Sequence, residues 1–329
     1  MREIKPKISV VVPVYNVEAY VEKCLTSLAA QTHPNMEVLV VDDASTDGGG
    51  PICDAWAARD RRFRVLHLPE NQGLSAARNE GVRQAAGDYV AFVDSDDYVE
   101  PDLLETLYRA LEENCADISI CGDEGLRLKP GPAQVLTPAA AARCLAGRSP
   151  FLWTAWGKLF PMELARRISF DRSALCCEDL LFFYQALKRA GRIAYVPDPL
   201  YHYVFREGSL VNHGVTEKRC TVLPVLDRIC EDAAANFKEV EPCFRQVAMD
   251  TAARLAMQAL EDGAEGSVQD YLKRFRDHTR RHFSWRAWSL YPDQKSAAAE
   301  LALCVGTPVF RALAAVYGQI KRRRKNGVE

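Results

Sequence analysis

The stretch Tyr89-Val90-Ala91-Phe92-Val93-Asp94-Ser95-Asp96-Asp97 joins an apolar run to a cluster of carboxylates. The run is short, uncharged and rich in β-formers, which predicts a strand buried on both faces. In an open α/β sheet, ligands bind outside the carboxyl ends of the strands. Residues i and i+2 of an extended chain point to the same side. We therefore expect Asp94 and Asp96 to converge on one ligand, and two acids at this spacing suit a hard divalent cation. Taken alone, the pattern fits equally well with Ser95 or Asp97 capping a following helix.

Apolar runs of the same kind recur along the first 121 residues and alternate with helical patterns. This alternation predicts a doubly wound α/β fold, with a mostly parallel sheet and helices on both of its faces. Residues 122–150 are rich in Gly, Pro and Ala, and predict an irregular excursion or hairpin. The expected strands are 8–12, 37–41, 63–68, 89–93 and 118–121, and the expected helices are 17–31, 50–60, 74–86, 101–113 and 178–190.

Composition and missing motifs exclude several classes of protein. With 329 residues, 48% of them hydrophobic, the chain can bury a substantial core. The eleven cysteines are scattered without zinc spacing, which indicates reduced thiols and a cytoplasmic protein. We expect neither a signal peptide nor a transmembrane helix. Pro13-Val14-Tyr15-Asn16 stands where a dinucleotide site would have Gly-x-Gly-x-x-Gly, and the chain contains no P-loop.

Four ordered motifs in the first half together resemble the nucleotide-sugar-binding domain of family 2 glycosyltransferases, which have the GT-A fold. The likeness is close over about the first 120 residues and looser through Trp156-x-Lys158-Leu159-Phe160, Glu178-Asp179 and Tyr201-x-Tyr203-x-x-Arg206-x-Gly208-Ser209. The four motifs are Pro13-Val14-Tyr15-Asn16, Val41-Asp42-Asp43-x-Ser45-x-Asp47-Gly48, Asn71-x-Gly73-Leu74-Ser75-x-Ala77-Arg78-Asn79-x-Gly81 and Gly87-Asp88-Tyr89-x-x-Phe92-x-Asp94-Ser95-Asp96-Asp97.

The resemblance implies a nucleotide pocket that binds a UDP-sugar. Tyr15 matches the residue that packs on uracil, and a flat side chain at a strand end suits base stacking on physical grounds as well. Asp43 matches the residue that pairs with the imide edge of the base. Arg78 matches a base or phosphate contact, while Pro13 and Glu18 shape the pocket. Without the motif context, Tyr15 is an ordinary turn aromatic and Arg78 lies on a solvated helix face.

The resemblance also implies a reaction centre. Asp94, with Ser95 beside it, faces ribose or metal, and Asp96 is the metal ligand that bridges to the diphosphate. The metal is Mn²⁺ or Mg²⁺, whose charge neutralises the leaving diphosphate. Glu178 and Asp179 match the acidic pair of the family, in which Asp179 is the base. A start-of-helix position favours the ionised carboxylate, so we expect Asp179 to be available but weak as a base. A simple preference for acids at helix starts is the alternative.

Four further residues are assigned to an acceptor wall or to a loop over the diphosphate. A cation and a hydroxyl in a mobile loop can close over a diphosphate, which suits Arg206 and Ser209. Trp156 and Lys158 are candidates for the acceptor wall, although packing of Trp156 in the core explains it equally well.

The predicted activity is transfer, with inversion, of a sugar from a UDP-sugar to a hydroxyl of a glycan or a lipid-linked saccharide, in polysaccharide synthesis. The alternative is a non-catalytic nucleotide-sugar-binding or scaffold protein on the same fold. Retention of both Asp43 and Asp179 favours the enzyme. A nucleotidyltransferase is disfavoured because the glycine-rich loop after the first strand is missing.

The last part of the chain differs in charge from the rest. We expect a catalytic domain over 1–214, made of halves 1–121 and 122–214, and a helical region over 215–329. Residues 271–329 hold 13 Lys/Arg and 4 Asp/Glu, although the whole chain has a net charge of −2. An interrupted apolar segment, 297–320, precedes the basic residues 321–325. This pattern predicts an interfacial anchor on the inner face of the cell membrane. A packed helix with a solvated end is the alternative, and nucleic-acid binding is disfavoured because no motif accompanies the charge.

Overall fold

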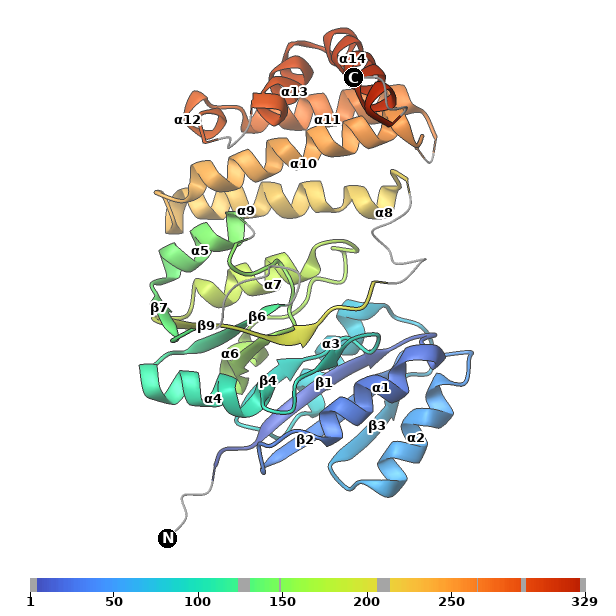
Figure 1. Cartoon of the computed structure of the whole chain (residues 1–329), viewed down its shortest axis with the longest axis vertical. Coiled ribbons are helices and arrows are strands. Elements are labelled where there is room, and N and C mark those ends of the chain that lie inside the picture. Colours follow the sequence, from blue (N-terminus) through green and yellow to red (C-terminus); the bar gives the residue numbers. More distant parts are fainter. Residues whose placement is uncertain are drawn as a thin grey trace. The chain divides into compact units, whose positions relative to one another are not determined.

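The computed structural model describes residues 5–123, 131–147, 149–205, 214–264, 266–290 and 294–325. The chain divides into two compact units, which Figure 1 draws. The first comprises residues 1–173 and 177–205, and the second comprises 174–176 and 206–329. The sequence analysis placed this boundary after residue 214.

Four parallel strands form one half of the sheet of the first unit, in the order β3-β2-β1-β4. The chain runs outward from β1 to β2 and β3 and then returns to add β4 on the other side of β1. The strand order therefore reverses between β1 and β4, and this reversal is where open α/β sheets bind ligands. The bounds are β1 Ile8–Val14, β2 Met36–Asp42, β3 Phe63–His67 and β4 Tyr89–Phe92.

The other half of the sheet is mixed. Strand β8 pairs antiparallel with both β4 and β6, whereas β6 and β9 are parallel, and β5 and β7 pair antiparallel with β9. The result is a mostly parallel sheet over the residues that the structure describes, as the sequence predicts. The bounds are β5 Tyr98–Val99, β6 Ile118–Asp123, β7 Gln134–Leu136, β8 Lys158–Pro161 and β9 Ile193–His202.

Helices cover both faces of this sheet. Val10 and Val12 of β1 share one core cluster with apolar residues of α1, α2 and α4. Val11 faces the other side, where α3 lies so close that a Cβ on Gly81 would be 2.3 Å from the Val11 side chain. On that side Phe92 packs edge-on against Phe182 of α7. The helices are α1 Glu18–Ala29, α2 Gly49–Arg59, α3 Leu74–Gln84, α4 Leu103–Asn114, α6 Met162–Arg167 and α7 Glu178–Leu187.

One prediction about this unit is wrong. Residues 122–150 were expected to form an irregular excursion or a hairpin, but among their described residues α5 spans Pro138–Gly147, and β7, which precedes it, pairs with β9. Proline is well tolerated in the first turn of a helix and alanine has the highest helix propensity, so the Pro and Ala content of this segment favours a helix.

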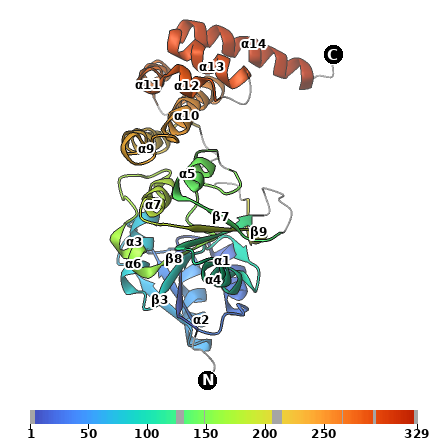
Figure 2. The ribbon, with the colours of Figure 1, turned by 90° about the vertical axis from the view of Figure 1, so that its left-hand side faces the viewer.

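The second unit is built from helices over its described residues, and Figure 2 shows α9 to α14 after a 90° turn about the vertical axis of Figure 1. Helix α10 packs on α9 and α11, and α13 packs on α14 and α11. Among the described helices, none is both long enough and apolar enough to cross a lipid bilayer. The bounds are α8 Glu217–Cys220, α9 Val222–Asn236, α10 Glu241–Glu261, α11 Val268–His282, α12 Trp285–Trp288, α13 Gln294–Val305 and α14 Thr307–Lys325.

Candidate active site

Four of the predicted nucleotide-binding residues lie at the carboxyl ends of β1 and β2: Pro13, Tyr15, Glu18 and Asp43. Pro13 is buried inside β1, and Tyr15 follows that strand with 46% of its surface exposed. Glu18 accepts a hydrogen bond from the backbone N–H of Gly48 (2.9 Å) and donates its own backbone N–H to Asp47 (2.8 Å). These bonds join the loop after β1 to the loop after β2. An exposed ring held on a fixed loop is suited to stacking on a base.

Asp43 fixes the start of α3. Its two carboxylate oxygens accept the backbone N–H groups of Gln72 and Gly73, each at 2.8 Å, and the residue is 3% exposed. Gly73 has φ +88°, a conformation that favours glycine. Because a carboxylate has about four acceptor positions, Asp43 can still accept a further hydrogen bond. Its pairing with a nucleobase stays a prediction.

The acidic motif after β4 alternates between partly exposed and buried residues. Asp94 and Asp96 are partly exposed, whereas Ser95 and Asp97 are buried. The two acids that were expected to share a ligand are therefore the pair that solvent reaches.

Asp97 does not cap α4. Its carboxylate accepts hydrogen bonds from the Tyr201 hydroxyl and from the backbone N–H of Val204, both at 2.8 Å, and the same hydroxyl accepts the backbone N–H of Asp94. Burial, followed by the charge of Asp94, raises the pKa of Asp97 to about 7. Asp97 thus holds the acidic motif against β9, and sequence reasoning assigned it no such role.

Arg78 of α3 lies at the centre of the site and is 1% exposed. Its guanidinium donates to Asp94 (2.8 Å), to Glu178 (3.1 Å) and, at shorter range, to Asp179. Burial opposes its charge, but the three carboxylates outweigh burial and raise the pKa of Arg78 above its ordinary value. Arg78 is therefore not on a solvated helix face, and a direct contact with base or phosphate stays a prediction.

Asp179 is the carboxylate whose expected properties need correction. It accepts the backbone N–H of Ala155 (2.9 Å) in addition to Arg78. Burial raises its pKa to about 7; Arg78 opposes this shift, and Glu178 adds to it. The expectation of a carboxylate kept ionised and weakly basic by the helix dipole is wrong, because burial dominates. A general base with a pKa near neutrality is more effective than one with the ordinary pKa of aspartate.

Trp156 and Lys158 lie in the core. Trp156 is 6% exposed and stacks on Tyr201 with ring centroids 4.1 Å apart. Lys158 is 2% exposed, and its ammonium donates to the carbonyl oxygens of Thr154 (2.7 Å) and Trp156 (3.2 Å). This burial favours the packing alternative for Trp156, and contact of either residue with an acceptor stays a prediction. Arg206 and Ser209 lie outside the described residues.

Comparisons with known proteins identify the family of the chain. Residues 9–124 match the family model described as Glycosyl transferase family 2. Glycosyltransferase GlyA of Streptococcus pneumoniae is 37% identical over 63% of this chain, and the match spans 32% of GlyA. Glycosyltransferase GlyG of the same organism is 33% identical over 62% of this chain and 72% of GlyG. The chain belongs to glycosyl transferase family 2.

A solved structure shows the same fold. The crystal structure of Staphylococcus aureus TarS residues 1–349 in complex with UDP has a TM-score of 0.69 and 22% sequence identity, covering 95% of this chain and 91% of that chain. The expected GT-A fold with a helical C-terminal region is therefore confirmed.

Proposed function

We propose that the protein transfers a sugar, with inversion, from a UDP-sugar to a hydroxyl group of a saccharide or lipid-linked saccharide in polysaccharide synthesis. The observation that carries this proposal is the arrangement around Arg78. One buried guanidinium connects Asp94 of the solvent-facing acidic pair to the buried carboxylate of Asp179. In the proposed reaction, the donor-binding and proton-accepting groups are therefore neighbours at the switch point of the sheet.

Two features support a uridine nucleotide as the donor's leaving group. Tyr15 presents an exposed ring at the end of β1, and the Asp43 carboxylate lies at the end of β2. TarS, which shares the fold, has been solved with UDP and with UDP-GlcNAc.

Asp94 and Asp96 fit a divalent cation. They offer hard carboxylate oxygens on the partly exposed side of their loop, and Mg²⁺ binds through one or two carboxylates and substrate phosphates. When bound, Mn²⁺ or Mg²⁺ supplies charge neutralisation at the leaving diphosphate. Arg78 holds one oxygen of Asp94 and so limits how that side chain can turn.

In this proposal Asp179 accepts the proton of the acceptor hydroxyl while that oxygen attacks the anomeric carbon and the bond to UDP breaks. The hydrogen bonds from Ala155 and Arg78 hold the carboxylate in one orientation. Glu178 accepts a hydrogen bond from the same guanidinium. Burial raises the pKa of Asp179, and the negative charge of Glu178 raises it further. A single base acting in one displacement inverts the anomeric centre.

The test is a donor screen with purified full-length protein. Release of UDP from a panel of UDP-sugars and GDP-sugars is measured with Mn²⁺, with Mg²⁺ and with a chelator, in the presence of saccharide acceptors. We expect UDP release from one or more UDP-sugars that depends on the cation and that Asp179→Asn reduces. Tight UDP binding without any turnover, unchanged by Asp179→Asn, would favour the non-catalytic binding protein.

We further propose peripheral contact with an anionic membrane through α14. The exposed positions of α14, Pro308, Val309, Ala312, Ala315 and Val316, follow helical spacing and are all apolar. The sequence of the same helix ends in Lys-Arg-Arg-Arg-Lys at 321–325. An apolar stripe continued by a basic cluster suits an interface with anionic lipids, which would bring a lipid-linked acceptor near the enzyme.

A further inference from the structure

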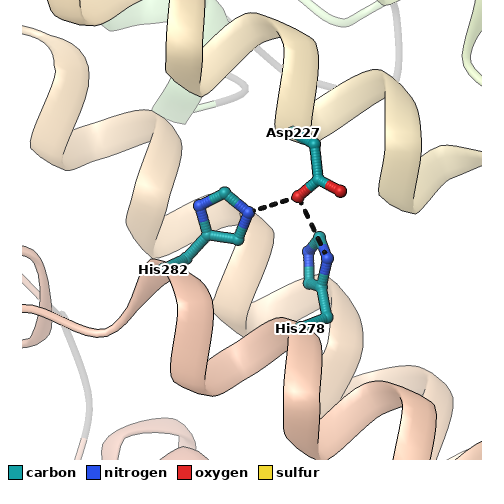
Figure 3. Close-up of side chains that lie close together, drawn as sticks. All are labelled: Asp227, His278 and His282. Carbon is teal, nitrogen blue, oxygen red and sulfur yellow. Dashed lines mark hydrogen bonds and ion pairs between the residues drawn. The ribbon is translucent and has the colours of Figure 1, made fainter.

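The helical unit contains a cluster that the proposed transferase reaction does not use. Asp227 on α9 faces His278 and His282 on α11, as Figure 3 shows. Residues four apart on a helix lie on the same face, so α11 presents both imidazoles to one point. One ligand atom from each of the three side chains lies within 4.8 Å of the other two.

The cluster is buried and convergent. His278 is 4% exposed and His282 is 3% exposed, while the Asp227 side chain is 20% exposed. Both rings approach the same carboxylate oxygen of Asp227, His282 Nε2 at 2.5 Å and His278 Nδ1 at 3.3 Å. Within the described part of the chain, the other nitrogen of each ring has no hydrogen-bond partner. Each ring therefore directs one nitrogen, Nδ1 of His278 and Nε2 of His282, at the same oxygen of Asp227.

Arg281 forms an ion pair with Asp227. Its guanidinium contacts the second carboxylate oxygen at 2.6 Å, leaving the first oxygen to the histidines. Carboxylates that bind metals are commonly oriented by such an outer hydrogen bond. The positive charge of Arg281 disfavours a cation nearby, but its side chain is 61% exposed and water screens the repulsion.

We propose that Asp227, His278 and His282 bind a divalent transition-metal ion of the zinc class, with solvent in the remaining coordination position. Two imidazoles and one carboxylate suit Zn²⁺, and nitrogen ligands favour the late transition metals over Mn²⁺ and Mg²⁺. The site differs in chemistry from Asp94 and Asp96, which offer only oxygen. A bound ion links α9 to α11 and so stabilises the helical unit.

The test uses tag-free, full-length protein freed of metal by a chelator and titrated with Co²⁺, a visible reporter of zinc sites. We expect one Co²⁺ per chain with visible ligand-field absorption, displaced by Zn²⁺ and not by Mg²⁺. Asp227→Asn and His282→Gln should each weaken binding by at least about 10-fold, since even outer-shell changes cost 10–100-fold. Thermal unfolding should shift upward with Zn²⁺ in the wild type and not in these variants.

Two control variants and one independent measurement make the outcome decisive. His67→Gln removes a histidine that also contacts two carboxylates, Asp42 (2.8 Å) and Asp54 (3.0 Å), but is about half exposed. His67→Gln and Asp96→Ala should both keep Co²⁺ binding. X-ray absorption of the Zn²⁺-loaded wild type should show two imidazole ligands, even if the cluster variants do not fold. An oxygen-only shell, or Co²⁺ affinity equal in wild type and Asp227→Asn, would overturn the proposal.

Discussion

Replacing Asp179 by asparagine should remove most of the activity and yet stabilise the first unit at alkaline pH. Loss of a general base reduces turnover by at least about 10²-fold. The stability effect follows from burial, which raises the pKa of Asp179 from 3.8 to about 7. At 1.36 kcal/mol per pKa unit, ionising this carboxyl in the folded chain costs about 4 kcal/mol more than in the unfolded chain. Asparagine avoids that cost.

The raised pKa of Asp179 makes the stability of the wild type depend on pH. Between pH 4 and pH 7 the unfolded chain has already lost this proton while the folded chain keeps it, so wild-type stability falls as pH rises. The variant lacks this fall. It loses one or two hydrogen bonds to Ala155 or Arg78, which cost about 1–2 kcal/mol. Wild type and variant should therefore be about equally stable at pH 5, and the variant should be more stable by about 2–3 kcal/mol at pH 8.

Native-state hydrogen exchange of amides in β1 and β4 measures this difference, because these strands report on the first unit by itself. Asp60→Asn is the matched control. Its hydrogen bonds with Arg62 lower the pKa of Asp60, so Asp60 stays ionised in folded and unfolded chains from pH 5 to pH 8. The control should lose stability by the same amount at both pH values. A pH-independent difference for Asp179→Asn would refute the assignment of a raised pKa.

Three further changes test other parts of the proposal. Asp96→Ala should abolish the Mn²⁺-dependent part of UDP binding in calorimetry, and unchanged metal dependence would contradict its role. Tyr15→Ala should weaken UDP binding by roughly 1–3 kcal/mol, the scale of a lost base stack; binding equal to wild type would place the uracil elsewhere. Replacing the basic residues of 321–325 with glutamine should release the protein from anionic vesicles in flotation, at about 1 kcal/mol per charge. Wild type that does not float at low salt would exclude membrane contact.

The periodic pattern of apolar residues predicted most strands and helices, because this pattern is set by residues close together in the sequence. The strand expected at 8–12 is observed at Ile8–Val14, and the helix expected at 178–190 is observed at Glu178–Leu187. The mixed half of the sheet could not be predicted in the same way. Strand β8 enters between β4 and β6 by antiparallel pairing, and such order depends on contacts between residues about 40 to 70 positions apart.

The ion pairs around Arg78 could not be predicted from the sequence either, because they also join residues far apart in the chain. Motif order brought Asp94 and Asp179 into one proposal, but nothing local indicates that Arg78 contacts both, because Asp179 lies 101 positions away. Tyr201 was part of a quoted motif, yet its hydrogen bond to Asp97 spans 104 positions. The cluster on α9 and α11 had a local signal in the spacing of His278 and His282, which sequence analysis did not use.

The helix-start rule predicted the wrong direction for the pKa shift of Asp179. A helix start stabilises a carboxylate by about 0.3–1 kcal/mol at an exposed position, and up to about 2 kcal/mol when partly buried. Burial among Glu178 and Asp94 acts in the opposite direction, and the shift to about 7 amounts to about 4 kcal/mol. The larger effect decides the protonation state, and it depends on neighbours that only the folded chain brings together. The same neighbours that make ionised Asp179 costly therefore make it a stronger base, so stability at alkaline pH and basicity should oppose each other at this residue.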